Sequence, residues 1–372
     1  MEFNLNLTIW NILIGIFLIV GITFGLLLFF TKRENRPANK FMAFVVIAIS
    51  LWLLWVFLSD IGFLDYYPRI TWFPITTYLL CIGPALYFYV VKLIDPSFHL
   101  KAKHYLHFSP IVLEFTFHIF QVMDSYSIGQ PIHRTSTFMN ISPFFQLLAI
   151  ISIAVYVRLS IKRIKAFTLL LADNYSNGDK YKLVWLKRLI YFFGLMWLLW
   201  LPYTFVDYFF FDFELNFRHY YPLYLIMGLV SILMGIEVFL RPEYILLEMK
   251  PSSEKKTIDE LDKKVDWLKK EIEQNLYFLN PELTLNSLAE HLNLHPNFLS
   301  HIINEGIHKN FSDFINEYRV ETVINKINEK EYKNITLVGI AHESGFNSKT
   351  SFYRTFKKFT NKTPSEYLKE NR

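Results

Sequence analysis

The chain has 372 residues, enough for two or three domains. Apolar residues make up 52% of it and charged residues only 19%, against about 25% in a typical soluble domain. Together with a mean hydropathy of +0.24 and a net charge of +5, this composition indicates a membrane protein. The single cysteine, Cys81, excludes a disulfide framework and a Cys-x-x-Cys metal or redox site.

Seven apolar stretches approach the roughly 20 residues that a helix needs to cross the hydrocarbon core of a bilayer. They are Ile9–Phe30, Phe41–Leu58, Trp72–Ile94, Phe108–Val122, Ile141–Ile161, Leu189–Phe211 and Pro222–Leu240. The fourth is the weakest, because it is short and contains Glu114 and His118, so six spans are the alternative. The first is not expected to be a cleaved signal peptide, since it lacks a basic segment and its apolar core is too long. Residues 1–241 are thus expected to form a seven-helix membrane domain.

Lysine and arginine collect in alternate connections between these stretches. The connections after the first, third and fifth stretches hold most of them, including Lys32, Lys103 and Lys165. The other connections hold one arginine each: Arg69, Arg134 and Arg218. By the positive-inside rule, the N-terminus lies outside and the C-terminus in the cytoplasm, in the inner (cytoplasmic) membrane of the cell.

Four ionisable residues are expected at membrane depth: Glu114, His118, Asp207 and Glu237. An ionisable group in lipid is costly and therefore a candidate functional group, here for sensing a ligand or a proton. Glu114 and His118 are four residues apart, so they share a helix face and could pair. The alternative is that these groups form hydrogen bonds that hold the helix bundle together.

Residues 242–275 are expected to connect the membrane domain to the rest of the chain. Apolar residues recur there at 3, 4, 3, 4 spacing, the pattern of a two-heptad coiled-coil seam. They are Ile258, Leu261, Val265, Leu268 and Ile272. One interpretation is a parallel helix that makes the protein a homodimer and carries a signal. The other is an amphipathic helix that lies on its own domain.

Residues 276–372 carry two helix-turn-helix patterns. In the first, Thr284 caps a helix that ends at Leu292, and a turn at Asn293–Leu294 leads to a second helix over His295–Glu305. Two short helices joined by a tight turn place the second helix in the major groove of DNA. A longer amphipathic helix, Phe311–Asn328, follows, with Phe314, Ile315, Tyr318, Val323 and Ile327 as its apolar face.

The second pattern repeats the first. Thr336–Ser344 is the first helix, Gly345 permits the turn, and Ser348–Phe359 is the second recognition helix. The sequence Thr363-Pro364-Ser365-Glu366 is a capping box with proline at the first helical position, so it opens a final helix.

These residues resemble the signature of AraC/XylS-type transcription regulators over roughly residues 276–372. The residues that carry the resemblance are Leu283-Thr284-Leu285, Ala289, Leu299-Ser300, Tyr318-Arg319, Ile340-Ala341, Glu343, Gly345-Phe346, Phe352, Phe356-Lys357-Lys358 and Thr363-Pro364-Ser365-Glu366-Tyr367. The resemblance implies two helix-turn-helix units, bridged by the long helix, that read successive major-groove segments of double-stranded DNA. Asn361 replaces a usual glycine, but asparagine tolerates the left-handed conformation that the turn needs. Val323 replaces a usual alanine on the long helix.

The resemblance also implies the residues that contact DNA. Lys349, Thr350 and Arg354 match positions that face the groove, and Arg354 can bond guanine in a bidentate way. Lys357 and Lys358 are expected nearer the phosphates. The first recognition helix offers Asn297, Ser300 and His301 but no arginine or lysine before Lys309. It is therefore expected to contribute less, in a domain that holds 12 lysines and arginines against 13 acidic residues from 271 to 372.

The resulting hypothesis is an all-α, membrane-embedded transcription regulator that couples a membrane or extracellular signal to gene expression. Its partners are double-stranded DNA, the lipid bilayer, a second copy of the chain and a signal that the sequence does not identify. No catalytic motif is present, so no enzyme, metal or cofactor is expected. The alternative is a transporter with a regulatory cytoplasmic tail, although no internal repeat supports it.

Overall fold

The computed structural model describes residues 7–31, 36–176, 183–211, 217–240, 259–330, 333 and 335–370. Within these ranges the chain is helical and has no β-strand, which confirms the all-α class. The chain divides into two compact units. The first unit contains residues 1–164 and 184–246, and the second contains residues 165–183 and 247–372.

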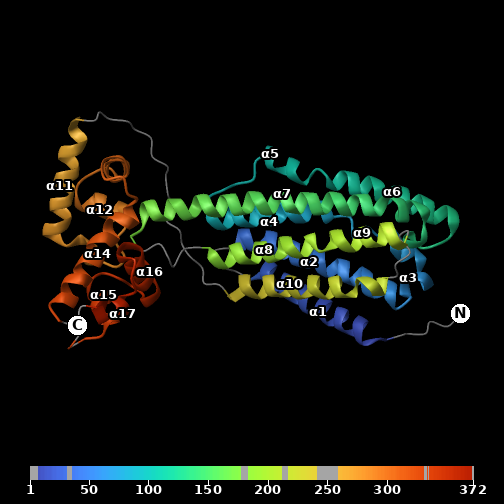
Figure 1. Cartoon of the computed structure of the whole chain (residues 1–372). Helices are drawn as coiled ribbons and strands as arrows, with labels where there is room; N and C mark the ends of the chain where they lie inside the picture. The colour runs from blue at the N-terminus through green and yellow to red at the C-terminus, as the bar shows by residue number, and fades with distance from the viewer. Residues whose placement is uncertain are drawn as a thin grey trace. The chain divides into compact units, whose positions relative to one another are not determined.

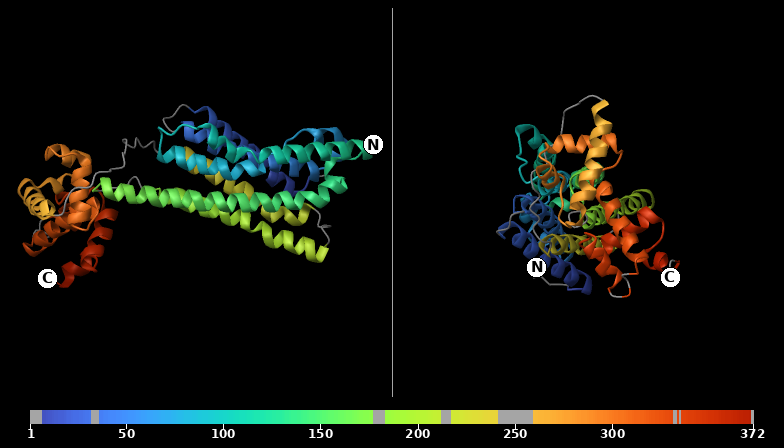
Figure 2. Two further views of the ribbon diagram at one scale, coloured as in Figure 1. Left: turned by 90° about the horizontal axis from the view of Figure 1, so that it is seen from above. Right: turned by 90° about the vertical axis from the view of Figure 1, so that its left-hand side faces the viewer.

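The main helices of the first unit run side by side (Figure 1, Figure 2). They are α1 (Ile9–Phe30), α2 (Arg36–Asp60), α4 (Leu79–Ile94), α6 (Ile111–Ile128), α7 (Ser136–Asn174), α8 (Val184–Leu198), α9 (Trp200–Phe211) and α10 (Tyr221–Leu240). Short helical turns join them: α3 (Phe63–Tyr66), η1 (Pro68–Trp72), α5 (Ala102–Tyr105), η2 (Leu106–Phe108), η3 (Ile132–Arg134) and η5 (Phe217–Tyr220).

Six helical segments of the described chain are long and apolar enough to cross a membrane, and α4 is a further apolar helix of 16 residues. Of the seven expected spans, the third forms too short a helix to be counted among the six, and the segment that contains the expected fourth span has the lowest mean hydropathy of the six. The segment Ala102–Ile128, which contains the expected fourth span, meets the length and hydropathy of a span. The number of spans stays a prediction.

Prolines account for the two places where an expected span is interrupted. The third span was expected to begin at Trp72, but the α-helix begins only at Leu79, after a non-helical segment that contains Pro74. The sixth span is divided between Leu198 and Trp200. Pro202 has no N–H to donate to the carbonyl of Leu198, so one hydrogen bond of a regular helix is missing at this division.

The second unit contains the helices of the two helix-turn-helix patterns. They are α11 (Asp259–Asn275), η6 (Tyr277–Leu279), α12 (Leu285–His291), α13 (Pro296–His301), the π-helical turn η7 (Ile302–Gly306), α14 (Phe311–Asn328), α15 (Leu337–Glu343), α16 (Lys349–Thr360) and α17 (Pro364–Glu370). The unit has two hydrophobic cores, one around α12 and α13 and one around α15 and α16. Helix α14 contributes to both cores, with Phe314 and Ile315 in the first and Val323 and Ile327 in the second.

Helix α11 is part of the first of these cores, which corrects the interpretation of the connector as a dimerisation helix. Val265, Leu268 and Ile272 are buried in this core, and α11 packs against η6 and η7 of the same chain. The fit is close, because a Cβ on Gly306 would lie 2.5 Å from a Val265 methyl carbon. The seam therefore faces its own domain and is not exposed to a second copy. Ile258 lies outside the described residues.

The packing of α11 predicts that Leu268→Ala destabilises a soluble fragment of residues 259–372 by about 2–5 kcal/mol, the usual cost of emptying a buried leucine site. Lys269→Ala, at the exposed neighbouring position, is the matched control and should change stability little. Denaturant unfolding at two protein concentrations measures both effects. A midpoint that rises with concentration would instead indicate that the seam joins two copies.

Candidate nucleic-acid interface

The first helix-turn-helix is built as its sequence predicts. The hydroxyl of Thr284 accepts a hydrogen bond from the N–H of Ser287 and so caps α12. Asn293 adopts the left-handed conformation (φ 52°), which turns the chain between α12 and α13. His295 caps α13, and Pro296 occupies its first turn, where a missing N–H costs nothing.

The first recognition helix is shorter than expected, and its candidate DNA-contacting side chains are partly buried or hydrogen-bonded within the domain. Its α-helix ends at His301 and continues as the π-helical turn η7. Asn297, Ser300 and His301 are all half-buried, and Ser300 accepts a hydrogen bond from the side chain of Asn304. The Nε2 atom of His301 is buried and has no hydrogen-bond partner among the described residues. In this orientation of the ring, Nε2 does not face solvent and could not reach a base.

The second helix-turn-helix depends on a glycine at its turn. Gly345 has a φ of 90°, a conformation that side chains disfavour. A Cβ at this position would also lie 2.3 Å from the carbonyl oxygen of Phe278. The residue is therefore required both for the turn and for the close approach of the segment that precedes the first helix-turn-helix.

The ends of α16 and α17 follow the caps that the sequence predicts. Ser348 caps α16, and Asn361 ends it in the left-handed conformation (φ 59°), as expected for the residue that replaces glycine. The N–H of Thr363 donates to Glu366 at 2.7 Å, and the N–H of Glu366 donates to the Thr363 hydroxyl at 3.3 Å. Hydrogen bonds from the backbone N–H and the side chain of Thr363 lower the pKa of the Glu366 carboxyl, so the capping box carries its charge at neutral pH.

Helix α16 presents a basic face to solvent. Lys349, Thr350, Arg354, Lys357 and Lys358 are all exposed, whereas Phe352 and Phe356 are fully buried in the second core. The residues at 350, 354 and 357 follow helical spacing, so they form one exposed stripe. The structure thus separates the residues expected to face DNA from the residues expected in the core.

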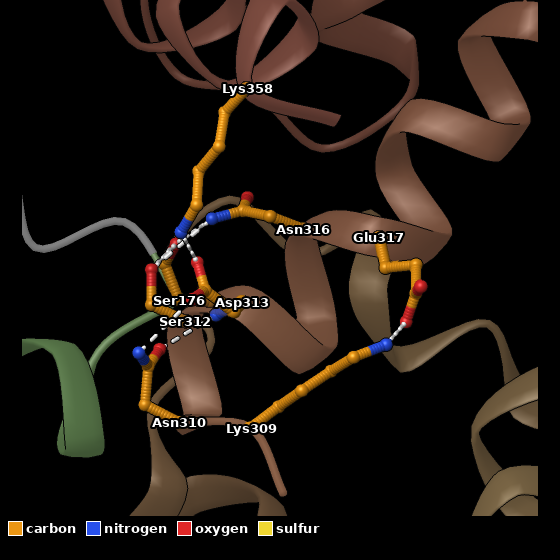
Figure 3. Close-up of polar contacts among 8 residues, drawn as sticks. All are labelled: Ser176, Lys309, Asn310, Ser312, Asp313, Asn316, Glu317 and Lys358. Atoms are coloured by element: carbon orange, nitrogen blue, oxygen red, sulfur yellow. Dashed lines mark hydrogen bonds and ion pairs between the residues drawn. The ribbon is translucent and has the colours of Figure 1, made fainter. Parts of the chain in front are cut away.

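Two lysines near this interface have acidic partners within the domain. The ammonium of Lys358 lies 2.5 Å from a carboxylate oxygen of Asp313, in the first turn of α14. Lys309 is paired with Glu317 in the same way. Figure 3 shows both ion pairs on the same helix, α14. Lys358 would have to exchange Asp313 for a phosphate, so Lys357 is the simpler phosphate contact.

The residue that joins the two helix-turn-helix units is Arg319 on α14, whose structural role the sequence does not reveal. Its side chain is fully buried. The guanidinium donates to the carbonyl oxygens of Phe278 and Asn280, both at 2.7 Å, and lies 6.0 Å from the ring of Phe346. Burial lowers the pKa of the guanidinium to about 9, so it remains charged at neutral pH. The only sequence signal was its place in the Tyr318-Arg319 pair.

The structure does not bring the four ionisable residues of the first unit together. Glu114 accepts a hydrogen bond from the N–H of Leu80 at 2.8 Å, and Nε2 of His118 lies 2.9 Å from the carbonyl oxygen of Trp72. The two residues share a face of α6, but each binds backbone at the start of the third span and not the other. Asp207 accepts from the Tyr220 hydroxyl at 2.5 Å, and Glu237 is half-buried on α10.

No group of three or more histidine, cysteine, aspartate or glutamate side chains that could hold a metal ion occurs among the described residues. What the described part of the first unit offers instead is pairwise hydrogen bonding between helices and irregular backbone. That chemistry fits helix-bundle stabilisation. A sensing role for these residues stays a prediction.

With this geometry in place, comparison with known proteins identifies the class of the C-terminal domain. Residues 288–370 match the family model described as "Helix-turn-helix domain", which is of the AraC type. These residues are an AraC-type helix-turn-helix domain, which confirms the resemblance drawn from the sequence. The relatives of the chain are named as HTH-type transcriptional regulators.

The individual relatives share only this part of the chain. An uncharacterized HTH-type transcriptional regulator of Staphylococcus aureus (strain MSSA476) is 36% identical over 86 residues, which are 23% of this chain and 11% of the relative. The regulator YtdP of Bacillus subtilis (strain 168) is 27% identical over 31% of this chain and 15% of its own length. YijO of Escherichia coli (strain K12) is 31% identical over 24% and 30%, respectively.

The chain therefore spans between about a tenth and a third of the length of these relatives. Among solved structures, a protein of unknown function from Listeria innocua is 25% identical with a TM-score of 0.26, over 29% of this chain and 97% of that one.

The exposed stripe on α16 predicts distinct effects on DNA binding by the 259–372 fragment. Arg354→Ala should lower preference at one base pair by about 1–3 kcal/mol, because it removes a bidentate contact to guanine. Lys357→Ala should weaken binding to all DNA sequences alike, because it removes one phosphate contact. It should also reduce the slope of the logarithm of the binding constant against the logarithm of the salt concentration by about 1. His301→Ala should cost less than Arg354→Ala. Titrations against a randomised site measure all three, and a larger loss from His301→Ala would make the first unit the main reader.

The hydrogen bond between Glu114 and the N–H of Leu80 predicts different outcomes for two substitutions. Glu114→Gln keeps an oxygen that can accept this bond, so the protein should accumulate in the membrane at close to the wild-type level. Glu114→Leu removes the acceptor and leaves a buried N–H unsatisfied, which costs about 1–3 kcal/mol, so its level should fall. Quantitative immunoblots of membrane fractions test this. Equal loss in both variants would mean that the charge, and not the hydrogen bond, is what the fold requires.

Proposed function

We propose that this protein is a membrane-embedded, sequence-specific DNA-binding transcription regulator that couples a membrane or extracellular signal to gene expression. The observation that carries the proposal is the presence in one chain of an AraC-type domain at residues 288–370 and six helical segments able to cross a membrane. The first requires access to DNA, and the second holds the protein at a bilayer.

Sequence-specific binding is supported by the second recognition helix. Its exposed stripe combines Arg354, which can read a guanine edge, with lysines that can contact phosphates. Because the C-terminal hundred residues are close to neutral overall, attraction to DNA would come from this stripe and not from the charge of the whole domain.

The orientation we propose places the N-terminus outside and the DNA-binding domain in the cytoplasm of a cell whose inner membrane holds the protein. It is supported by the uneven distribution of lysine and arginine among the connections. It is also the only orientation in which an AraC-type domain meets chromosomal DNA.

Fusions of a reporter enzyme test the orientation and the membrane embedding together. Reporters after Lys103 and after Arg372 should register as cytoplasmic, and those near Gly129 and Asn216 as external, because basic connections are retained inside. Mapping of chromosomal sites bound by the intact chain should recover discrete sites that Arg354→Ala weakens. A cytoplasmic reporter at Gly129 would rule out the proposed fourth span, and a chain that recovers no sites would rule out the regulator.

A further inference from the structure

The chain that leaves α7 is hydrogen-bonded to the start of the first helix-turn-helix. Ser176 lies two residues beyond the last residue of α7 and is 1% exposed. Its N–H donates to the carbonyl oxygen of Leu283 at 3.2 Å, and its hydroxyl donates to the same oxygen at 2.7 Å. The preceding residue, Tyr175, forms an antiparallel bridge with Thr284, the residue that caps α12.

The other side of Ser176 meets α14. The carbonyl oxygen of Ser176 accepts hydrogen bonds from Asn316 at 3.0 Å and from Ser312 at 3.3 Å, and its hydroxyl accepts from Arg319 at 3.0 Å. Figure 3 shows the Ser312 and Asn316 side chains directed at Ser176. Asn316 and Arg319 are themselves buried. Every polar group of Ser176 thus has a partner, and buried polar groups that lose their partners are costly.

Ser176 docks at the part of the domain that sets the relation between the two recognition helices. Arg319, which binds its hydroxyl, is the residue that joins the two helix-turn-helix units. Ser312, which binds its carbonyl, precedes Asp313, the carboxylate that holds Lys358 of α16. Ser176 is thus bonded both at the start of α12 and at the first turn of α14.

Helix α7 is a continuous helix that rigidly connects this docking site to the membrane. It is continuous from Ser136 to Asn174, 39 residues or about 58 Å, nearly twice the roughly 30 Å of a hydrocarbon core. Its last turns, from Lys165, belong to the second unit. By contrast, 18 residues separate Leu240 of α10 from Asp259 of α11. A chain of 18 residues reaches at most about 60 Å.

We propose that Tyr175 and Ser176 form an intramolecular latch, and that a signal received in the membrane reaches the DNA-binding unit through α7 and this latch. The latch rests on the proposed function, because it needs a signal to transmit. A shift of α7 withdraws Ser176 from Leu283 and Arg319. The two helix-turn-helix units then lose a shared partner, and the distance between their recognition helices on DNA is no longer fixed.

Hydrogen exchange of the full chain in lipid nanodiscs tests the docking itself. The peptide that contains Ser176 should exchange slowly in the wild type. Ser176→Val removes the hydroxyl bonds to Leu283 and Arg319 and should speed exchange about fivefold or more, the factor expected from one net hydrogen bond. Asn174→Ala is the matched control, because its side chain bonds Leu170 of α7 itself. Equal exchange in Ser176→Val and wild type would overturn the latch.

A second experiment tests the route of the signal, with a reporter gene driven by a promoter that the intact chain binds. Four flexible residues inserted between Asn174 and Tyr175 leave Ser176 able to dock but remove its rigid link to α7. Reporter output should then change about fivefold, as in Ser176→Val. The same insertion after Lys250 should leave output near the wild-type level. A larger effect of the insertion after Lys250 would place the route in the α10–α11 connection and overturn the proposal.

Arg354→Ala in the same reporter assay separates this proposal from the proposed function. If Arg354→Ala abolishes regulation while Ser176→Val and the insertion after Asn174 change nothing, the protein is a regulator and the latch is wrong. If Arg354→Ala also leaves the output unchanged, the proposed function itself is wrong. The helical circular dichroism of the detergent-solubilised Ser176→Val protein, compared with that of the wild type, shows whether this variant is folded.

Discussion

The arrangement of the DNA-binding unit depends on the buried guanidinium of Arg319. A charge without solvent is stable only when its donors are satisfied, and here carbonyl oxygens of Phe278 and Asn280 satisfy them. This requirement fixes the segment before the first helix-turn-helix against α14. The same side chain lies beside Phe346, so the second unit is positioned by the same residue. Gly345 is needed because no Cβ fits between this turn and that segment.

Buried polar groups of the first unit also need hydrogen-bond partners, here among apolar helices. Backbone groups that leave a helix at membrane depth need partners from the protein, because lipid offers none. The segment before α4 and the first turn of α4 obtain them from one face of α6. There, His118 binds the carbonyl of Trp72, Glu114 binds the N–H of Leu80, and Ser125 binds the indole N–H of Trp72. The presence of Glu114, His118 and Ser125 on α6 is therefore explained by what each of them binds.

The sequence was informative wherever structure is set by neighbours along the chain. The caps at Thr284 and Ser348, the left-handed Asn361 and the buried face of α16 follow from local spacing and conformational preference. The sequence left open what the apolar face of α11 packs against, because an apolar face of two heptads can be buried equally well by a partner helix or by the same domain. Arg319 and Ser176 were not predictable as partners, since 143 residues separate them and polar residues carry no periodic signal. The pairing expected between Glu114 and His118 was wrong for the same reason: the backbone that they bind is 34 and 46 residues distant.

The shortness of α4 has a consequence for how the protein would fit its bilayer. A helix of 16 residues is about 24 Å long, roughly 6 Å less than an average hydrocarbon core. The segment that α6 binds would have to cover this difference in length. A thicker bilayer would therefore strain those hydrogen bonds, and a thinner one would reduce the strain. Helix α7, at 39 residues, is longer than either bilayer is thick and would cover both hydrocarbon cores. In the proposed bilayer, hydrophobic thickness would thus act unequally on the two helices, and lipid composition would be a variable to which this fold responds.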